Sequence, residues 1–390
     1  MKDYHLLLAC DKYYLSYMFV ACQSILNGIK NSTNVIQQDE QIVFDIIIDS
    51  SVNKEKASEL AESFCKRNDF INTKFVFYNA DENEFEEARG WGDHQTKSAF
   101  YRLLMDRFLP NNVHKLLYID IDVLVLGDIR ELINTSMEDS VLGTVYTHTY
   151  WRSDYNAGKL YLNPIKENNT NKTVTLDELD YFNSGVLLIN LDQWRKENTG
   201  QRAIDFVHNY NPIVLDQDTL NYVTNNNLAL DWSWNFQCWM FYIDKDSLKS
   251  DGGYVRFDSD KDKHQFKSRK VYLESVYEGL NSCNIVHFTY SKPWKDHPFI
   301  PDEGRHFLFN EQLVKALNMW QEIARQTPEC VGVHIPNTTI ASTTGDILNH
   351  TSLRLTKETK QSKKKRRELR NLFLSLIGVL LVLQIISIFF

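Results

Sequence analysis

The sequence predicts an α/β protein with a mostly parallel central sheet flanked by helices. Short apolar runs of strand length alternate with longer segments whose apolar residues recur at helical spacing, which is the rhythm of βαβ units. The strand-like runs are apolar at successive positions, as in strands covered on both faces. A content of 43% hydrophobic and 13% aromatic residues in 390 residues is enough to bury a large core.

The first five elements follow this rhythm. Residues 6–10, 42–49 and 73–78 are expected to be strands, and residues 14–26 and 54–68 to be helices. The turn after the first strand reads Asp-Lys-Tyr-Tyr, without a Gly-x-Gly-x-x-Gly motif or a Walker lysine. Dinucleotide binding and P-loop chemistry therefore lose support, and the turn offers a carboxylate and aromatic faces instead.

A carboxylate pair interrupts the most apolar part of the chain. Residues 98–108 are expected to form a helix that Pro110 ends, and the chain then enters the apolar run 113–128. Asp120 and Asp122 fall inside this run, where residues two apart in one strand face the same side. Buried carboxylates need a counter-ion, and hard divalent cations suit them. We therefore predict a metal site at a strand end, with an ordinary strand-to-loop exit as the alternative.

The predicted binding crevice lies beyond the carboxyl ends of the strands, where open α/β sheets bind ligands. Asp11 follows the first strand, and the Asp120/Asp122 pair lies in the later apolar run. Arg102, on the helix before that run, is placed at the same crevice. A helix-surface arginine is an equal alternative for this residue.

The stretch 181–191 is a small-residue turn followed by a buried strand. At Asn183-Ser184-Gly185 the backbone can approach a ligand closely, and the Asn183 amide offers both a donor and acceptors. A plain turn is the alternative. A helix is then expected from residue 192 to about residue 210.

Residues 215–221 indicate a loop that enters a helix with acidic residues at its start, where the helix dipole favours them. Capping explains one carboxylate but not the Asp216-Gln217 pair. Further on, a short strand is expected to end in His287, before a turn that carries Lys292. The imidazole could complete an Asp/Asp/His set for Mn²⁺, and the lysine would supply charge to a phosphate, although a lone histidine on an apolar segment is more often structural.

Charge and cysteine content narrow the class of protein. The formal net charge of −8 gives no reason to expect nucleic acid as a partner. The six cysteines include no Cys-x-x-Cys pair, which suits a reducing compartment and argues against a zinc ribbon or a disulfide framework. The N-terminus leads directly into the first strand, and that segment is too short for a signal peptide.

Four motifs together resemble glycosyltransferase family 8, the retaining GT-A enzymes typified by bacterial lipooligosaccharide galactosyltransferases and lipopolysaccharide hexosyltransferases. They are Ala-Cys-Asp at 9–11, Leu-Tyr-Ile-Asp-Ile-Asp-Val-Leu-Val at 117–125, Tyr-Phe-Asn-Ser-Gly-Val-Leu-Leu-Ile-Asn at 181–190, and His-Phe-Thr with Lys-Pro-Trp at 287–294. The resemblance spans residues from about 4 to about 300. It implies a Rossmann-like GT-A fold.

The resemblance also implies a UDP-hexose donor whose diphosphate holds Mn²⁺, or Mg²⁺ in its place. The implied roles are metal binding by Asp120, Asp122 and His287, phosphate contact by Lys292, uracil contact by Asp11 and Tyr14, donor-sugar contact by Arg102 and Asn183, and a place beside the anomeric carbon for Asp216 and Gln217. An amide is a poor nucleophile, which suits attack on the same face of the sugar through an oxocarbenium-like state.

Two positions depart from the family pattern. Thr147 stands where relatives usually place an aspartate, and Tyr290 stands where relatives have glycine in a segment one residue longer. The region 151–175 aligns poorly, so no residue is carried over there. It is expected to carry acceptor specificity.

Composition changes sharply after an expected catalytic domain at 1–327. Residues 328–362 are rich in Thr, Ser and Asn and are expected to form a polar linker. A basic cluster then opens the segment 363–390, whose last 19 residues, 372–390, are almost entirely apolar. At about 1.5 Å per residue they would just cross the hydrocarbon layer as a C-terminal membrane helix. The basic flank predicts a cytoplasmic catalytic domain, and an in-plane anchor on anionic lipid is the alternative.

The prediction is thus a metal-dependent retaining hexosyltransferase. It would move galactose or glucose from a UDP-sugar to a lipid-linked, lipopolysaccharide-type glycan at the cytoplasmic side of the inner membrane. A nucleotide-sugar hydrolase or nucleotidyltransferase could use the same carboxylates, but it would want a more basic phosphate loop after the first strand. A membrane-tethered, non-catalytic sugar-binding relative is the third interpretation, and the joint presence of the candidate metal and sugar-side residues argues against it.

Overall fold

The computed structural model describes most of the chain before residue 337. The described residues are 2–86, 88, 97–146, 165–176, 181–242, 278–289, 292–295 and 311–336. The predicted membrane anchor, the predicted linker from residue 337 onward, and the departures at Thr147 and Tyr290 lie outside them. Within these ranges no helix combines the length and the apolar character needed to cross a membrane.

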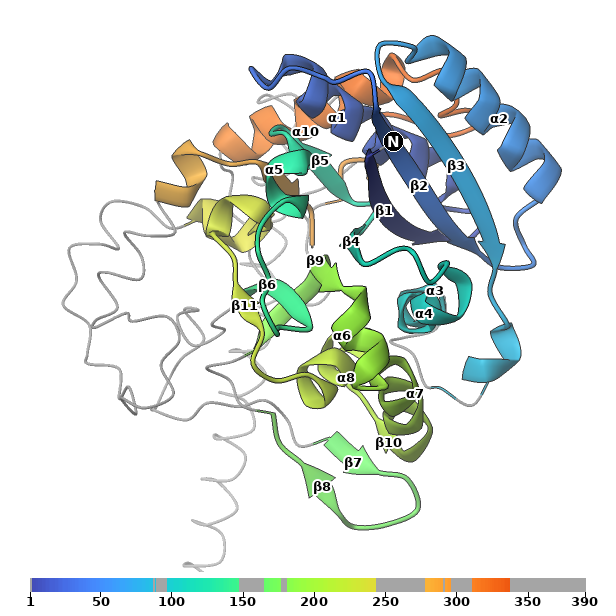
Figure 1. The fold of residues 1–390 in the computed structure, drawn as a ribbon, viewed down its shortest axis with the longest axis vertical. Helices are drawn as coiled ribbons and strands as arrows, with labels where there is room; N and C mark the ends of the chain where they lie inside the picture. Colours follow the sequence, from blue (N-terminus) through green and yellow to red (C-terminus); the bar gives the residue numbers. More distant parts are fainter. Residues whose placement is uncertain are drawn as a thin grey trace, which may run out of the picture.

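A seven-stranded sheet forms the centre of the molecule, in the order β11-β6-β9-β4-β1-β2-β3 (Figure 1). Its strands are β1 (Lys2–Cys10), β2 (Glu40–Ile48), β3 (Asn72–Asn79), β4 (Lys115–Ile119), β6 (Leu142–Tyr146), β9 (Phe182–Asn190) and β11 (Leu228–Ala229). Neighbouring strands are parallel except where β9 pairs with β4 and β6. The prediction of an α/β fold with a mostly parallel sheet is confirmed, and the one antiparallel strand makes the sheet mixed.

Helices pack on both faces of this sheet, and apolar side chains form a core on each face. One core contains α1 (Leu15–Asn31), α2 (Lys54–Arg67) and α5 (Ile129–Ile133). The other contains η1 (Glu82–Phe85), α3 (Ser98–Tyr101), η2 (Arg102–Leu104), α4 (Met105–Phe108), α6 (Leu191–Lys196), α7 (Thr199–Asn209) and α8 (Leu215–Val223). Within β1, Leu6 and Leu8 join the first core and Leu7 joins the second, which explains why the strand is apolar at successive positions.

Two three-stranded sheets complete the described fold. The first has the order β12-β13-β5, with β12 (Phe236–Gln237), β13 (Ile285–His287) and β5 (Val123–Val125). Its core includes side chains of η4 (Trp232–Trp234), η5 (Cys238–Tyr242) and α10 (Glu311–Arg325). The second has the order β10-β7-β8, with β10 (Tyr210–Asn211), β7 (Ile165–Glu167) and β8 (Thr173–Val174). The first of these sheets lies beside the candidate site because β13 carries His287.

The single strand expected over 113–128 is wrong. β4 ends at Ile119 in the seven-stranded sheet, and β5 begins at Val123 in a different sheet. The backbone N–H of Asp120 still donates to the carbonyl of Gly185 at 2.7 Å, after which the chain turns away. A strand with apolar cores on both faces offers no polar partner for two carboxylates, so the chain leaves the sheet where they occur. The carboxylates therefore converge because of a turn rather than because of strand alternation.

Two expected helices are also interrupted. The helix expected over 98–108 consists of two short α-helical turns joined by a 3-10 turn. The helix expected from residue 192 to about 210 is divided into α6 and α7, because Asn198 between them has a left-handed φ of 53°. Asparagine is one of the few residues that tolerate this conformation.

The start of the segment predicted as a linker lies against the body of the protein. Arg67 of α2 forms an ion pair with the buried Glu329 at 2.6 Å, and the Ser16 hydroxyl of α1 donates to the carbonyl of Val331 at 3.0 Å. The chain is thus held against α1 and α2 after α10 ends. The domain boundary at residue 328 stays a prediction.

Candidate active site

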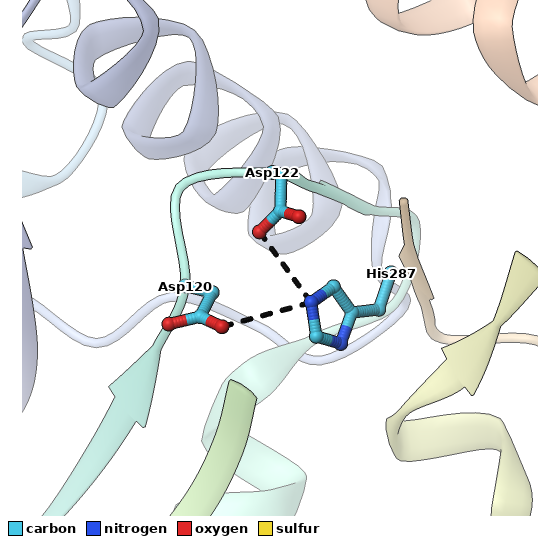
Figure 2. Close-up of side chains that lie close together, drawn as sticks. All are labelled: Asp120, Asp122 and His287. Carbon is cyan, nitrogen blue, oxygen red and sulfur yellow. Dashed lines mark ion pairs between the residues drawn. The ribbon is translucent and has the colours of Figure 1, made fainter. Parts of the chain in front are cut away.

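Two carboxylates and an imidazole converge between the seven-stranded sheet, which contains β4, and the β12-β13-β5 sheet (Figure 2). Asp120 follows the last residue of β4, Asp122 precedes β5, and His287 ends β13. The Nε2 atom of His287 lies 3.6 Å from Oδ2 of Asp120 and 3.4 Å from Oδ1 of Asp122. One ligand atom from each residue lies within 4.8 Å of the other two. This arrangement could hold a metal ion.

The second polar atom of each of these side chains is held by another residue. Oδ1 of Asp120 accepts hydrogen bonds from Arg102 at 2.8 Å and from the Tyr118 hydroxyl at 2.6 Å. Oδ2 of Asp122 contacts the ammonium group of Lys292. Nδ1 of His287 lies 3.0 Å from Oδ1 of Asn235. The three atoms that face one another are therefore oriented before any ion arrives.

Gly185 allows this close approach. A Cβ atom on Gly185 would lie 2.1 Å from Cε1 of His287 and 2.7 Å from Oδ2 of Asp120. Both contacts are shorter than van der Waals distance, so any side chain here would displace the imidazole or the carboxylate. The small residue that the sequence pattern identified is thus needed for packing against the candidate metal ligands.

Arg102 lies between the metal-side and the sugar-side carboxylates. The buried guanidinium donates to Asp120, forms an ion pair with Asp216 at 3.2 Å, and stacks over the Tyr118 ring at 4.0 Å from its centroid. Burial raises the pKa of Asp216 to about 6, with Asp120 acting in the same direction and Arg102 opposing it. Of the two alternatives for Arg102, the structure places it in the site rather than on a helix surface.

The Asp122 and Lys292 side chains stabilise each other's charge. Burial acts to raise the pKa of Asp122, but Lys292 and His287 together lower it below its ordinary value. For Lys292 burial acts to lower the pKa, and Asp122 raises it above the ordinary value. Both side chains are therefore charged at neutral pH.

Asp11 and Tyr14 line the same region. Oδ1 of Asp11 accepts the backbone N–H groups of Tyr13 and Tyr14, whereas its buried Oδ2 has no hydrogen-bond partner among the described residues. Burial raises the pKa of Asp11. The Tyr14 ring packs edge-on against the ring of Trp294, with 5.8 Å between the ring centroids. Trp294 lies two residues after Lys292. The first-strand turn and the Lys-Pro-Trp turn thus meet beside the candidate metal ligands.

Asn183 and Gln217 contact each other on the other side of Gly185. Nδ2 of Asn183 donates to Oε1 of Gln217 at 2.8 Å, and the backbone N–H of Ser184 lies 3.3 Å from the same oxygen. Asp216, the residue before Gln217, is held by Arg102. All ten predicted site residues therefore come from strand ends, turns and one helix start around a single location.

Sequence reasoning missed Asn235, Tyr181 and Asp218 as parts of this site. Asn235 is fully buried between Trp234 and Phe236 and bonds to both His287 and Asn183. The Tyr181 hydroxyl donates to Asp218 at 2.6 Å. For Asn235 the available signal was a polar residue inside an aromatic run, since buried amides require hydrogen-bond partners.

Comparison with known proteins agrees with this geometry. Residues 5–297 match the model of Glycosyl transferase family 8. A putative glycosyltransferase of Haemophilus influenzae is 26% identical over 219 residues, which cover 56% of this chain and 58% of that protein. General stress protein A of Bacillus subtilis is 27% identical over 286 residues, covering 71% and 85%. The lipopolysaccharide glucosyltransferase WaaO of Escherichia coli is 30% identical over 163 residues, covering 39% and 43%.

A solved structure shares the fold. The crystal structure of the galactosyltransferase LgtC in complex with donor and acceptor sugar analogs matches with a TM-score of 0.56 and 18% identity, covering 83% of this chain and 95% of that one. The sequence alignments reach little more than half of the first relative and less than half of WaaO.

The mixed sheet and its Asp/Asp/His cluster define an α/β protein of the GT-A class with a candidate divalent-metal centre. The family model covers well over half of the chain, and the chain belongs to glycosyltransferase family 8. The resemblance inferred from the four sequence motifs is confirmed.

Proposed function

We propose that the protein is a metal-dependent retaining hexosyltransferase. It moves galactose or glucose from a UDP-sugar to a lipid-linked glycan of the lipopolysaccharide type. The observation that carries the proposal is the convergence of Asp120, Asp122 and His287 immediately beside Arg102 and the sugar-side pair. Relatives named as lipopolysaccharide galactosyl- and glucosyltransferases support the choice of sugar and acceptor.

Mn²⁺ is the ion that the donor set favours. Two carboxylate oxygens with one imidazole nitrogen suit Mn²⁺, whereas Mg²⁺ is bound mostly through oxygens and water. When bound, the ion acts as a Lewis acid that stabilises charge on the leaving diphosphate. The protein contributes ligand atoms that are already aimed at one point, because Arg102, Lys292 and Asn235 hold the atoms behind them.

The remaining residues are assigned to the donor. Asp11 has a buried oxygen without a hydrogen-bond partner among the described residues, which can accept an N–H group of uracil, and Tyr14 offers its ring. Lys292 approaches the phosphates, and Arg102 and Asn183 contact the sugar. Asp216 and Gln217 lie at the reacting carbon. Because Gln217 is a neutral amide, these residues orient the donor and leave attack on the same face to the acceptor hydroxyl.

We further propose that the enzyme works at the cytoplasmic side of the inner membrane. The basic cluster within 363–370 and the apolar segment 372–390 are the sequence features that motivate this location. Flotation of the full chain with anionic-lipid vesicles tests the anchor. A variant that ends at residue 362 should stay in the vesicle-free fraction and keep transfer to a free-sugar acceptor, and flotation of that shorter variant would contradict the proposed anchor.

The donor specificity is tested by UDP release. The purified full chain is incubated with a panel of UDP-sugars and Mn²⁺, with and without a chelator, and released UDP is measured. We expect release from UDP-galactose or UDP-glucose that increases with a saccharide acceptor and stops with the chelator. Release that is equal with and without acceptor would favour a nucleotide-sugar hydrolase. Absence of any release, with intact Mn²⁺ binding, would favour a sugar-binding relative.

A further inference from the structure

A line of hydrogen bonds joins the candidate metal ligand His287 to the sugar-side residue Gln217. All its members are described residues, and they come from β13, the turn after η4, β9 with the residue before it, and α8. In order, the line runs His287, Asn235, Asn183, Gln217, Tyr181 and Asp218, with donor-to-acceptor distances of 3.0, 2.9, 2.8, 2.9 and 2.6 Å. Asn235 is fully buried and His287 almost fully buried.

Backbone N–H groups fix the orientation of every amide in this line. The N–H of Gly185 donates to Oδ1 of Asn183 at 3.0 Å, and a backbone N–H can only donate. The acceptor end of Asn183 therefore faces Asn235, which must present its NH₂ group there. The oxygen of Asn235 is then the atom that faces His287, so the imidazole must donate from Nδ1.

A second anchor fixes the other half of the line. The backbone N–H of Ser184 donates to Oε1 of Gln217, which leaves the Gln217 NH₂ group to donate to the Tyr181 oxygen. The Tyr181 hydroxyl then donates to Oδ1 of Asp218. The other oxygen of Asp218 accepts the backbone N–H groups of Ile213 and Val214 at 2.7 and 2.8 Å. Each side chain in the line thus has a single consistent orientation.

We propose that Asn235 is a positioning residue that holds His287 in the tautomer protonated at Nδ1, so that the lone pair of Nε2 faces Asp120 and Asp122. This inference rests on the metal site of the proposed function. The hydrogen bond behind a metal-binding histidine sets its tautomer and orientation, and such partners commonly change metal affinity about 10- to 100-fold. The same line fixes the direction of the Gln217 amide, so the ion site and the sugar side share one framework.

The tautomer can be observed without metal or substrate. Histidine-selective ¹⁵N labelling of the metal-free full chain, with long-range ¹H–¹⁵N correlation at about pH 8, distinguishes the two neutral tautomers. A His287→Gln sample identifies the relevant signals by their loss. We expect the tautomer protonated at Nδ1 in the unsubstituted protein and a mixture of both in Asn235→Ala. A tautomer protonated at Nε2 in the unsubstituted protein would overturn the proposal.

Metal affinity gives the second measurement, with Mn²⁺ alone as the probe and free Mn²⁺ followed by electron paramagnetic resonance. Asn235→Ala should weaken binding about 10- to 100-fold. Asn235→Asp keeps an acceptor for Nδ1–H but loses the NH₂ group that donates to Asn183, so it should bind Mn²⁺ more tightly than the alanine variant, and it also serves if the alanine variant does not fold. Asn68→Ala removes another buried asparagine with side-chain partners, outside the site, and should leave Mn²⁺ binding unchanged.

The outcomes separate the inference from the proposed function. Equal Mn²⁺ affinity in Asn235→Ala and the unsubstituted protein would overturn the role of Asn235 while leaving the metal site in place. Loss of affinity in Asn235→Asp equal to that in the alanine variant would also overturn it, since an acceptor for His287 is retained. Absence of Mn²⁺ binding in the unsubstituted protein, with the Nδ1 tautomer intact, would count against the proposed function alone.

Discussion

Two buried clusters of carboxylates and arginine lie at opposite ends of the central sheet, and they differ in where the cation sits. At the amino end, Arg130 lies between Glu40, at the start of β2, and Asp128, which caps α5. Its guanidinium donates to Glu40 at 2.7 Å and to Asp128 through Nε and a terminal nitrogen. The Tyr4 hydroxyl donates to Glu40. This cluster is closed around its own cation.

At the carboxyl end, the protein cations lie behind the Asp120/Asp122 pair instead of between its two carboxylates. Arg102 holds one oxygen of Asp120, and Lys292 holds one oxygen of Asp122. The remaining oxygens face the imidazole of His287 rather than a positive side chain. The comparison teaches that buried charge alone does not identify a site. What distinguishes the site is a set of ligand atoms that face one another. The second polar atom of each of these side chains is held by a neighbouring residue.

The largest effect is expected from Asp122→Asn, which breaks the open cluster. The amide keeps the side chain's shape but removes an anionic ligand, so metal assistance worth several kcal/mol is lost. Transfer should fall by about 10³-fold or more, and Mn²⁺ binding should be lost with it. UDP release and electron paramagnetic resonance measure the two effects, and circular dichroism checks the fold. Undiminished activity at low Mn²⁺ would refute the metal assignment.

Arg130→Met tests the closed cluster and should act on stability alone. It leaves Glu40 and Asp128 buried without their cation, which typically costs about 3–5 kcal/mol. Denaturant unfolding should show that loss, while the remaining folded protein should bind Mn²⁺ with unchanged affinity. A large loss of Mn²⁺ affinity in the folded fraction would show that the two clusters are coupled and that Arg130 does not act on stability alone.

The same contrast separates what the sequence could predict from what it could not. The elements from β1 to β3 follow apolar periodicity, and their predicted bounds agree with the structure to within a few residues at most ends. The break between β4 and β5 was missed because apolar residues flank Asp120 and Asp122 on both sides, although the two flanks belong to different sheets. Local periodicity carries no information about which sheet a strand joins.

Six of the ten candidate site residues were marked by the four sequence motifs: Asp11, Asp120, Asp122, Asn183, His287 and Lys292. The residues that orient them were not. Asn235 contacts His287 and Asn183, which lie 52 residues away in opposite directions along the chain, and nothing local marks it as their partner. Arg102 had equal alternatives until the fold placed it between Asp120 and Asp216. Sequence motifs therefore indicate the candidate ligands, whereas the long-range hydrogen bonds that orient them become visible only in the fold.

Gly185→Ala should have an intermediate effect on the open cluster. The added methyl group would overlap the imidazole of His287 and crowd Asp120, so the ligand atoms would lose their alignment. Mn²⁺ affinity should fall about 10- to 100-fold, as for a disturbed metal ligand. Gly143→Ala, in β6 of the same sheet, meets Leu188 at 3.2 Å and serves as the matched control. Equal Mn²⁺ affinity in the two variants would show that the approach at Gly185 is not needed.

The smallest effect is expected in the pH dependence of stability of the metal-free protein, where the contributions of Asp216 and Asp128 should have opposite signs. Burial raises the pKa of Asp216 to about 6, so between about pH 4 and 6 the folded state binds a proton that the unfolded state has released. Its contribution to stability therefore falls as pH rises through that window. The pKa of Asp128 is lowered, because hydrogen bonds and charge from Arg130 outweigh burial. Its contribution is present at neutral pH and is lost as pH falls below about 4.

These opposite signs can be measured with two asparagine variants. The thermal midpoint of Asp216→Asn, relative to the unsubstituted protein, should rise by a few degrees between about pH 4 and pH 7. The relative midpoint of Asp128→Asn should fall between about pH 2 and pH 5, because the unsubstituted protein gains stability from that carboxylate as the pH rises through this window. Changes of the same sign in both variants would mean that the open and closed clusters hold their carboxylates in the same way, and the distinction between them would fail.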